Sequence, residues 1–530
     1  MAHDTDAVQP ATVDAEKIRK SKEDVEVTAA PSISEGIVCE KIALDTVDAA
    51  DEYSQKDFRR LLWKIDLCLL PLMWFCYGMQ QADKTATSVM SVFGIRTDTN
   101  LQGQQFSWLT TIFYLSYLVA EAPGNYLIQK FHVGRFLGVC TIIWGIVVLC
   151  IGFAQNFAGL MVLRSLQGVF ECTISPTFLL ITGAFYTTKE HTLRAIIWGT
   201  ANAGMNVVTG LINYAIGDAA NDHPSGLRAW RGIAFFLGGF TVFLGALVFF
   251  ILGTPREVFW LSDREKRMAA ARVVSNQTGS DRQKHAEWKW SQVRTAMKDP
   301  QTYFFFVTNF AFAIPNGGNT TFGNLVYKSF GFTAEETLTK GTIPQHGFSI
   351  CWFLLAGITC YRWKNLRFYW MMFSLLPAFS GMMGLALLPK DDRSLLWTRW
   401  GLYLMTTCGT LPGLLMWTML PSNVAGRTKK SITATGLFIG YCAGNATGAQ
   451  LFQEKDAPDY IPGLTGCAVV YGLEIVLMSL WRTWYWYQNK RRDQKVKDMG
   501  LSYEECRRMG MVAAEEDVTD FENVHFRYQM

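Results

Sequence analysis

The chain carries little charge for its length, and its cysteine and histidine residues follow no metal-binding pattern. Charged residues make up 18% of its 530 residues, against roughly 25% in ordinary globular proteins. The net charge of +4 gives no basic footprint for nucleic acid. The twelve cysteines show no CxxC spacing, and most fall inside hydrophobic runs, where small buried thiols are common. We therefore expect no disulfide framework, metal site, cofactor or nucleic-acid partner.

Long uncharged runs are what the sequence has instead. Half of the residues are hydrophobic, including 36 Phe and 18 Trp. A helix needs about 20 apolar residues to cross roughly 30 Å of hydrocarbon. The segments that meet this requirement cover approximately residues 63–86, 105–127, 136–154, 158–184, 194–216, 232–252, 302–326, 342–361, 368–388, 395–420, 432–452 and 464–487. They predict an all-α membrane protein with twelve transmembrane helices in a lipid bilayer.

Charge divides the chain into five parts. Residues 1–60 lack an apolar core and a secretory signal, so we expect a disordered tail and insertion directed by the first helix. The charged stretch 253–300 is interpreted as a linker between six-helix bundles at 61–252 and 301–487, and residues 488–530 form a second tail. An even number of spans puts both tails on one side. Lys and Arg gather in the loops of that side, which predicts that both tails and the linker are cytoplasmic.

The fifth span of each half is rich in glycine and asparagine. The later one holds four glycines at helical spacing, Gly436, Gly440, Gly444 and Gly448. Such a stripe lets another helix pack closely and also slide or rock, or it is simply a static packing surface. Matching Gly-interrupted spans in two halves indicate parallel repeats around a shared site.

Charged residues in the fourth span share one helical face. A charge near the bilayer centre costs roughly 2.5–3.5 kcal/mol, so it needs a partner or a watery cavity. Gln167 and Glu171 follow Arg164 by three and seven residues, which places all three on one side of a helix. At 1.5 Å per residue, Arg164 and Glu171 lie about 10 Å apart along the axis. This separation predicts a substrate or a chain of water between them.

Other spans also contain ionisable residues. The first span covers only about 24 Å of uncharged helix before Asp83 and Lys84, so we expect both to face the membrane interior, with an interfacial position as the alternative. Glu121 is interpreted either as a proton relay or as a solvated end residue. His346 is either a relay or a hydrogen-bond donor between helices. Glu474 has no assigned role.

Polar groups in the later spans suggest a binding cavity. Pro315 and the glycine pair after it predict a break in the seventh helix, which is tolerated where the backbone lines protein or water. Five amide side chains are candidate hydrogen-bond donors that select a substrate: Asn202, Asn206, Asn316, Asn445 and Gln450.

Several motifs carry a family resemblance. Twelve spans, a long central loop and Arg164-Ser-Leu-Gln167-Gly168 resemble the major facilitator superfamily. More narrowly, the chain resembles the fungal allantoate permease family, a branch of the anion:cation symporters. The stretches that support this resemblance are Ala82-Asp83-Lys84-Thr85, Phe157-Ala158-Gly159-Leu160-Met161, Ile314-Pro315-Asn316-Gly317-Gly318, Ser422-Asn423-Val424-Ala425-Gly426, Phe438-Ile439-Gly440-Tyr441 and Thr519-Asp520-Phe521-Glu522-Asn523.

The resemblance implies a function. Members of this family take up a small organic anion, such as allantoate or a vitamin, together with protons across the fungal plasma membrane. Carried over to this sequence, it implies Asp83 and Glu171 as proton carriers and Lys84 and Arg164 as anion-binding residues. The energy source is then the proton gradient, and we expect a monomer.

Three alternatives stay open. The same framework can serve efflux of a fungal secondary metabolite, since sequence alone does not fix direction. A nonconducting nutrient sensor is the second alternative, although the tails contain no recognisable signalling domain. A membrane enzyme is the third, and the scattered histidines and missing nucleophile argue against it.

Overall fold

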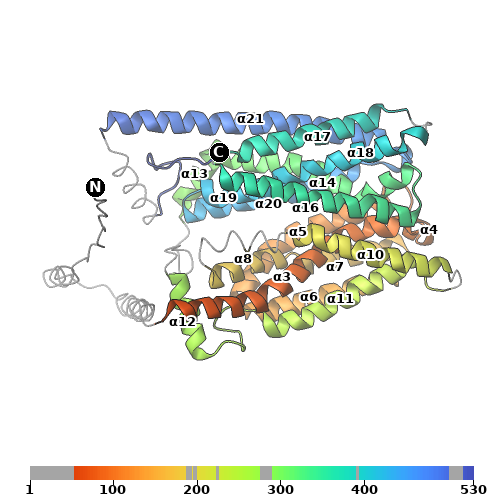
Figure 1. Cartoon of the computed structure of the whole chain (residues 1–530), viewed down its shortest axis with the longest axis horizontal. Coiled ribbons are helices and arrows are strands. Elements are labelled where there is room, and N and C mark those ends of the chain that lie inside the picture. Colours follow the sequence, from red (N-terminus) through yellow and green to blue (C-terminus); the bar gives the residue numbers. More distant parts are fainter. Residues whose placement is uncertain are drawn as a thin grey trace, which may run out of the picture.

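The computed structural model describes residues 53–186, 194, 200–222, 226–274, 289–363, 365–389, 393–500 and 517–530. Within these ranges the chain is helical and contains no β-strand. Figure 1 shows two layers of long helices, one from each half of the chain. The expected tail at residues 1–60 lies mostly outside the described residues, and the first described helix begins at Gln55.

The first half contributes six membrane-spanning segments. In chain order they are α3 (Gln55–Val92), α5 (Gln105–Lys130), α6 (Val133–Ile151), α7 (Phe157–Glu171) continued by α8 (Ile174–Phe185), α10 (Ala201–Asp222) and α11 (Ala229–Ile251). A short helix, α4 (Ile95–Asp98), follows α3, and α12 (Asp263–Val274) lies between the halves. The fourth span is thus two helices, which meet at Cys172 and Thr173.

The second half contributes six more. They are α14 (Pro300–Ser329), α16 (Ile343–Arg362), α17 (Arg367–Leu387), α18 (Leu396–Thr406) joined through η3 (Thr407–Thr410) to α19 (Leu411–Asn423), α20 (Arg427–Leu451) and α21 (Ile461–Asp498). Shorter elements are α13 (Trp290–Lys298), α15 (Ala334–Glu336), η1 (Thr337–Thr342), η2 (Arg393–Leu395) and η4 (Glu454–Asp456). The described chain therefore forms an all-α membrane fold of twelve spans in two six-helix bundles.

Composition marks only some of these spans strongly. Among the described residues, seven helices are long and apolar enough to cross a membrane by length and composition alone. Helices α5, α10, α14 and α20 are not among them, and neither is the span broken at η3. These spans are where amide, hydroxyl and glycine residues gather, as expected for helices that face a shared interior rather than lipid.

The seventh span corrects one expectation. A break was predicted at Pro315, but α14 runs without interruption from Pro300 to Ser329. Gly317 follows Pro315, and a side chain there would collide with the backbone of Asn445 in α20. The glycine therefore serves close packing between α14 and α20, and proline is tolerated inside the continuous helix.

The glycine stripe of α20 packs against the same helix. A Cβ atom added at Gly440, Gly444 or Gly448 would meet a backbone carbonyl oxygen of α14. Gly436 differs, because nothing lies within 4 Å of a Cβ built there. Three of the four predicted glycines thus set the distance between α20 and α14, and the fourth does not.

Polar contacts join the two bundles at the end of the molecule opposite the linker helices. Helices α12 and α13 lie at the same end of the molecule, which we call the linker end, and we call the opposite one the far end (Figure 1). Helix α5 packs on α20, and α3 packs on α14. At the far end Arg96 forms an ion pair with Glu454 at 2.6 Å, and the Asn324 backbone N–H donates to Ser88 Oγ at 3.2 Å. These polar contacts tie the bundles together there.

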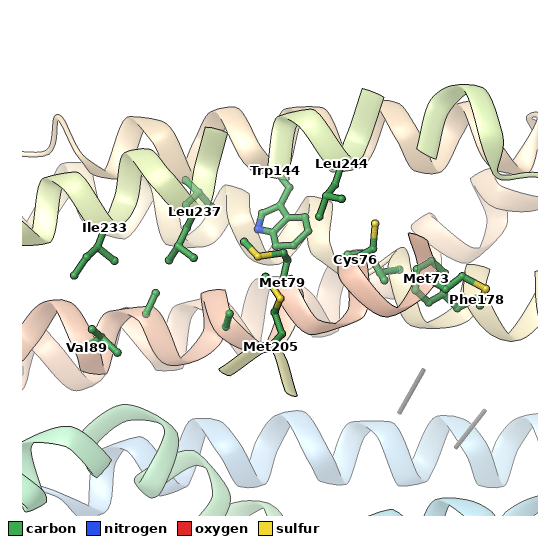
Figure 2. Packing of buried hydrophobic residues seen from close by; sticks show 14 of the residues in the cluster. Met73, Cys76, Met79, Val89, Trp144, Phe178, Met205, Ile233, Leu237 and Leu244 are labelled. Carbon is green, nitrogen blue, oxygen red and sulfur yellow. The ribbon is translucent and has the colours of Figure 1, made fainter. Parts of the chain in front are cut away.

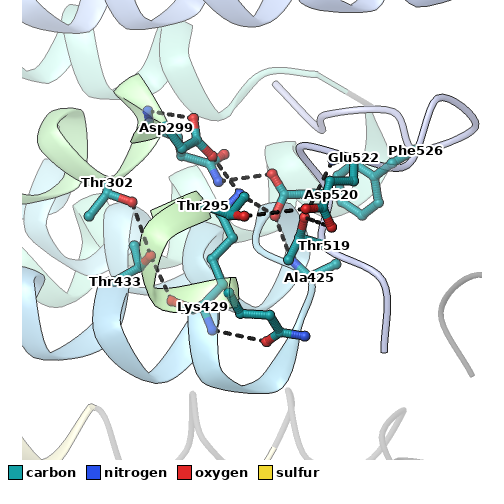
Figure 3. A network of polar contacts seen from close by, with 12 residues as sticks. Thr295, Asp299, Thr302, Ala425, Lys429, Thr433, Thr519, Asp520, Glu522 and Phe526 are labelled. Atoms are coloured by element: carbon teal, nitrogen blue, oxygen red, sulfur yellow. Dashed lines mark hydrogen bonds and ion pairs between the residues drawn. The ribbon is translucent and has the colours of Figure 1, made fainter. Parts of the chain in front are cut away.

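A segment at the C-terminus covers the linker end of the second bundle. We call residues 517–530 the C-terminal strap. Lys429 of α20 is fully buried and bridges Asp299 before α14 and Asp520 of the strap, at 2.5 and 2.8 Å (Figure 3). The Tyr528 ring stacks on Tyr485 of α21 with centroids 4.5 Å apart. The strap therefore ties the linker segment to α20 and α21.

Candidate functional site

The charged residues predicted from the sequence meet between α3 and α7. Asp83, Arg164 and Glu171 have exposed fractions of 1%, 3% and 0%. Lys84 Nζ lies 3.3 Å from Glu171 Oε1. Gln80, one turn earlier on α3, donates to the backbone carbonyl of Glu171 at 3.4 Å. Helices α3 and α7 thus present both predicted acids and both predicted cations to one interior region.

Gln167, which lies between Arg164 and Glu171 in the sequence, links Arg164 to Asp83. Its Oε1 accepts a hydrogen bond from Arg164 Nη1 at 2.6 Å, and its Nε2 donates to Asp83 Oδ2 at 2.5 Å. The Gln167 side chain therefore links the arginine to the first-span acid, and the predicted substrate or water between Arg164 and Glu171 stays a prediction. Since Gln167 donates to one group and accepts from the other, it couples the positions of both.

Two groups of this cluster remain incompletely paired. Neither oxygen of the Glu171 carboxylate makes a hydrogen bond to any described residue. The contact with Lys84, at 3.3 Å, is longer than the 2.7–2.9 Å typical of a charge-assisted bond. Arg164 Nε also lacks a hydrogen-bond partner within the described chain. Buried polar atoms of this kind leave room for a ligand or a proton to complete the pairing.

The break between α7 and α8 falls directly beside Glu171. Glu171 is the last residue of α7, and Cys172 and Thr173 separate it from α8. The Cys172 Sγ and Thr173 Oγ1 atoms donate to the carbonyls of Val169 and Phe170, which satisfies backbone groups at the break. Cys172 and Thr173 keep right-handed helical backbone angles, so the interruption is mild and α7 and α8 form one span.

Aromatic rings of α5 connect the charges to the other bundle. Lys84 Nζ lies 5.5 Å from the centroid of the Tyr117 ring, and the Arg164 guanidinium lies 5.2 Å from that of Phe113. Tyr117 in turn contacts Phe438 of α20, with centroids 5.4 Å apart. The charged cluster therefore lies next to the contact between the bundles.

Trp144 is a site residue that the sequence interpretation missed. It is fully buried in the N-terminal bundle, with Met79 and Leu244 beside it (Figure 2). Its indole Nε1–H donates to Asp83 Oδ2 at 2.6 Å. The available signal was the lone tryptophan of the third span, because a buried indole N–H needs a partner.

The predicted asparagines form two separate groups. Asn206 Oδ1 accepts from Thr85 Oγ1 at 3.0 Å, next to Lys84 in the chain, and its Nδ2 donates to the carbonyl of Asn202. In the other bundle Asn316 Nδ2 donates to Asn445 Oδ1 at 2.8 Å. The first group therefore lies near the charged cluster, and the second bridges α14 and α20.

Three other candidates take different places. Gln450 donates to Thr111 Oγ1 at 2.8 Å and so belongs to the far-end contact between bundles. Glu121 lies one turn beyond Tyr117 on α5, with one buried carboxyl oxygen unpaired within the described residues. His346 lies on α16, and no hydrogen bond or ion pair joins it to the cluster in the described chain.

The described residues contain no group of three His, Cys, Asp or Glu side chains placed to hold a metal ion. Glu474 lies in the C-terminal bundle, fully buried on α21, with both oxygens lacking a hydrogen bond among the described residues. Within the described part of the chain, no hydrogen bond or ion pair links Glu474 to the charged cluster.

Comparisons with known proteins place the chain in a family. Residues 73–449 match the Major Facilitator Superfamily. The allantoate permease of Saccharomyces cerevisiae is 31% identical over 90% of this chain and 88% of its own length. An uncharacterized transporter of Schizosaccharomyces pombe is 30% identical over 90% of this chain and 88% of its own. The crystal structure of a D-xylose-proton symporter shares the fold at 13% identity, with a TM-score of 0.59 over 78% of this chain and 96% of that one. The chain belongs to the Major Facilitator Superfamily, within the family of fungal transporters that includes allantoate permease, and is a multi-pass membrane transporter rather than an enzyme.

Proposed function

We propose that the protein carries a small organic anion into the cell together with protons. The observation that supports this most directly is the buried pairing of Lys84 with Glu171. An ammonium group held 3.3 Å from a carboxylate that makes no hydrogen bond can exchange that partner for the carboxylate of a substrate. Allantoate, a vitamin or a similar nutrient has this chemistry, and a relative is an allantoate permease.

Charge balance gives the coupling. When ionised, Asp83 and Glu171 together cancel the charges of Lys84 and Arg164. An entering carboxylate adds one negative charge to a site where uncompensated charge is costly. Protonation of Glu171 removes one negative charge and frees Lys84 at the same time. One proton per substrate carboxylate therefore keeps the loaded site neutral, and the proton gradient drives accumulation.

Movement of the bundles gives alternating access. The Tyr117 ring beside Lys84 also contacts Phe438 of α20, so a change of partner at Lys84 acts on the surface between the bundles. Opening at the far end requires separation of Arg96 from Glu454 and of Ser88 from Asn324. Closing at the linker end completes the exchange. In this proposal a single chain completes the cycle as a monomer.

The charge of the loops favours one orientation of the protein in its membrane. Lys and Arg on the linker side favour a cytoplasmic linker end, and uptake of nutrients favours the fungal plasma membrane. Efflux of a secondary metabolite is the competing direction. Whole-cell uptake of a labelled carboxylate, measured with and without a protonophore, distinguishes the two.

Glu171→Gln tests the coupling. The variant keeps the size of the side chain but cannot carry a proton, so proton-driven accumulation should be lost while exchange of labelled for unlabelled substrate persists. Glu474→Gln is the matched control, because it neutralises another fully buried acid in the other bundle. Normal pH-dependent accumulation by Glu171→Gln would reject the proposal.

A further inference from the structure

The last helix extends well beyond its neighbours. Helix α21 has 38 residues and is therefore about 57 Å long, whereas the hydrocarbon core is about 30 Å thick. In Figure 1 its C-terminal part continues past the other helices at the linker end. Trp486 and Tyr487 are half-exposed, and aromatic side chains of this kind mark the bilayer surface. The residues after Tyr487 therefore lie at headgroup level and beyond.

This extension is basic. Residues 490–498 contain five Lys or Arg and two Asp. Arg492 is buried and holds the strap, because its Nη2 donates to the carbonyl of Asp520 at 2.6 Å. Asp493 pairs with Arg527 of the strap at 2.8 Å. One cation and one acid are thus engaged in attaching the strap.

Four exposed cations remain, and two of them, Arg491 and Lys495, share one side of the helix. Arg491 and Lys495 are four residues apart, and neither pairs with an acid among the described residues. Like charges at this spacing repel each other. An anion bound between Arg491 and Lys495 would attract both side chains and so offset the repulsion between them.

A pocket lies beside these two cations. It has a volume of about 310 Å³, with Arg491, Arg492 and Lys495 of α21 on one wall and Phe521, Glu522 and Val524 of the strap on the other. Glu522 is the one acid of this lining; its Oε2 accepts from Thr519 Oγ1 at 2.9 Å and its Oε1 from Thr295 Oγ1 at 3.3 Å, and it stands against three cations. Phe521 is 43% exposed and offers an apolar surface. The pocket thus combines a net positive charge with an apolar surface beside it.

We propose that this pocket binds the phosphate of an anionic lipid headgroup. An arginine fork and a lysine ammonium suit phosphate oxygens, the first through paired hydrogen bonds and the second as a point charge. The source is lipid because the two cations lie within about two turns of the aromatic residues at the bilayer surface, where anionic headgroups are concentrated. A bound headgroup bridges α21 and the strap, and so holds the strap in place.

The test uses the purified full-length protein, freed of lipid and titrated with dioctanoyl phosphatidylinositol 4-phosphate. Arg491→Ala combined with Lys495→Ala should weaken binding about 30-fold, because each basic residue near a membrane surface contributes roughly five- to sixfold to the affinity. Lys490→Ala combined with Lys497→Ala is the matched control, because it removes the same charge from the same helix outside the pocket. It should change the dissociation constant less than threefold.

Three results would overturn the proposal. Equal losses in both double variants would mean diffuse attraction to the basic helix. Inositol 1,4-bisphosphate that binds as tightly as the lipid would make the ligand a soluble phosphate. Unchanged binding by Arg491→Ala with Lys495→Ala, in protein that melts at the wild-type temperature, would show that these two cations do not hold the ligand.

Discussion

Replacement of Lys429 by methionine tests the ion cluster that anchors the C-terminal strap. The Lys429 ammonium lies 2.5 Å from Asp299 and 2.8 Å from Asp520, and all three side chains are completely buried. Methionine keeps most of the volume of the lysine stem but leaves two buried carboxyl groups without their counterion. Removal of one partner from a buried ion pair costs about 3–5 kcal/mol, so we expect a loss of this size in the C-terminal bundle.

The loss should depend on pH. Burial raises the pKa of Asp299 above its ordinary value, although the Lys429 ammonium lowers it. Without Lys429 that pKa rises further. A carboxyl group with a raised pKa binds its proton more tightly in the folded chain, so stability is highest at low pH and is lost as the pH rises through the raised pKa. The deficit of Lys429→Met should therefore be smaller at pH 5 than at pH 8.

Thermal unfolding in detergent measures both effects. At roughly 2–4 °C per kcal/mol for a unit of 150–250 residues, Lys429→Met should lower the melting temperature by about 10 °C at pH 8. A variant that also carries Asp299→Asn and Asp520→Asn has no buried charge in the cluster and should recover most of the loss. An unchanged melting temperature in Lys429→Met, or no recovery in the triple variant, would refute the reasoning.

Two further substitutions have sharp expectations. A methyl group at Gly448 would collide with the carbonyl of Ile314 in α14, so Gly448→Ala should cost about 1–3 kcal/mol in thermal unfolding, whereas Gly436→Ala has open space and should cost nothing. Trp144→Phe removes a hydrogen bond of 2.6 Å to Asp83. A hydrogen bond to a charged acceptor is worth about 1.5–3 kcal/mol, so we expect the transport rate to fall about tenfold or more. In an Asp83→Asn background the same change should have little further effect, and an equal loss there would contradict a role through Asp83.

The spans were predictable because hydrocarbon leaves a compositional record along the chain. A helix in lipid needs about 20 largely apolar residues, and among the described residues length and composition alone mark seven helices strongly, while the spans richer in amide, hydroxyl and glycine residues are marked more weakly. The helix breaks were not predictable in the same way. Pro315 predicted a break where α14 is continuous, and the fourth span breaks after Glu171, where the sequence shows only a cysteine and a threonine. Local residue preference is a weak guide where neighbouring helices supply the missing contacts.

The candidate site divides similarly. Asp83, Lys84, Arg164 and Glu171 were identifiable because a charge in an apolar run is costly wherever it lies. Their pairing was not identifiable, because it depends on how α3 and α7 are rotated against each other. In the observed arrangement Lys84 pairs with Glu171, and Asp83 accepts hydrogen bonds from Gln167 and Trp144.

By itself the sequence determined the solvent of this protein, its number of crossings and the few charged positions that need an explanation, because each follows from a cost that every residue meets locally. Tertiary structure alone decided which charge meets which, why three glycines of α20 are fixed in place, and how the strap reaches Lys429 across 91 residues of chain. Those outcomes depend on contacts between segments far apart in the chain, and no local pattern encodes the distance or angle at which two helices meet.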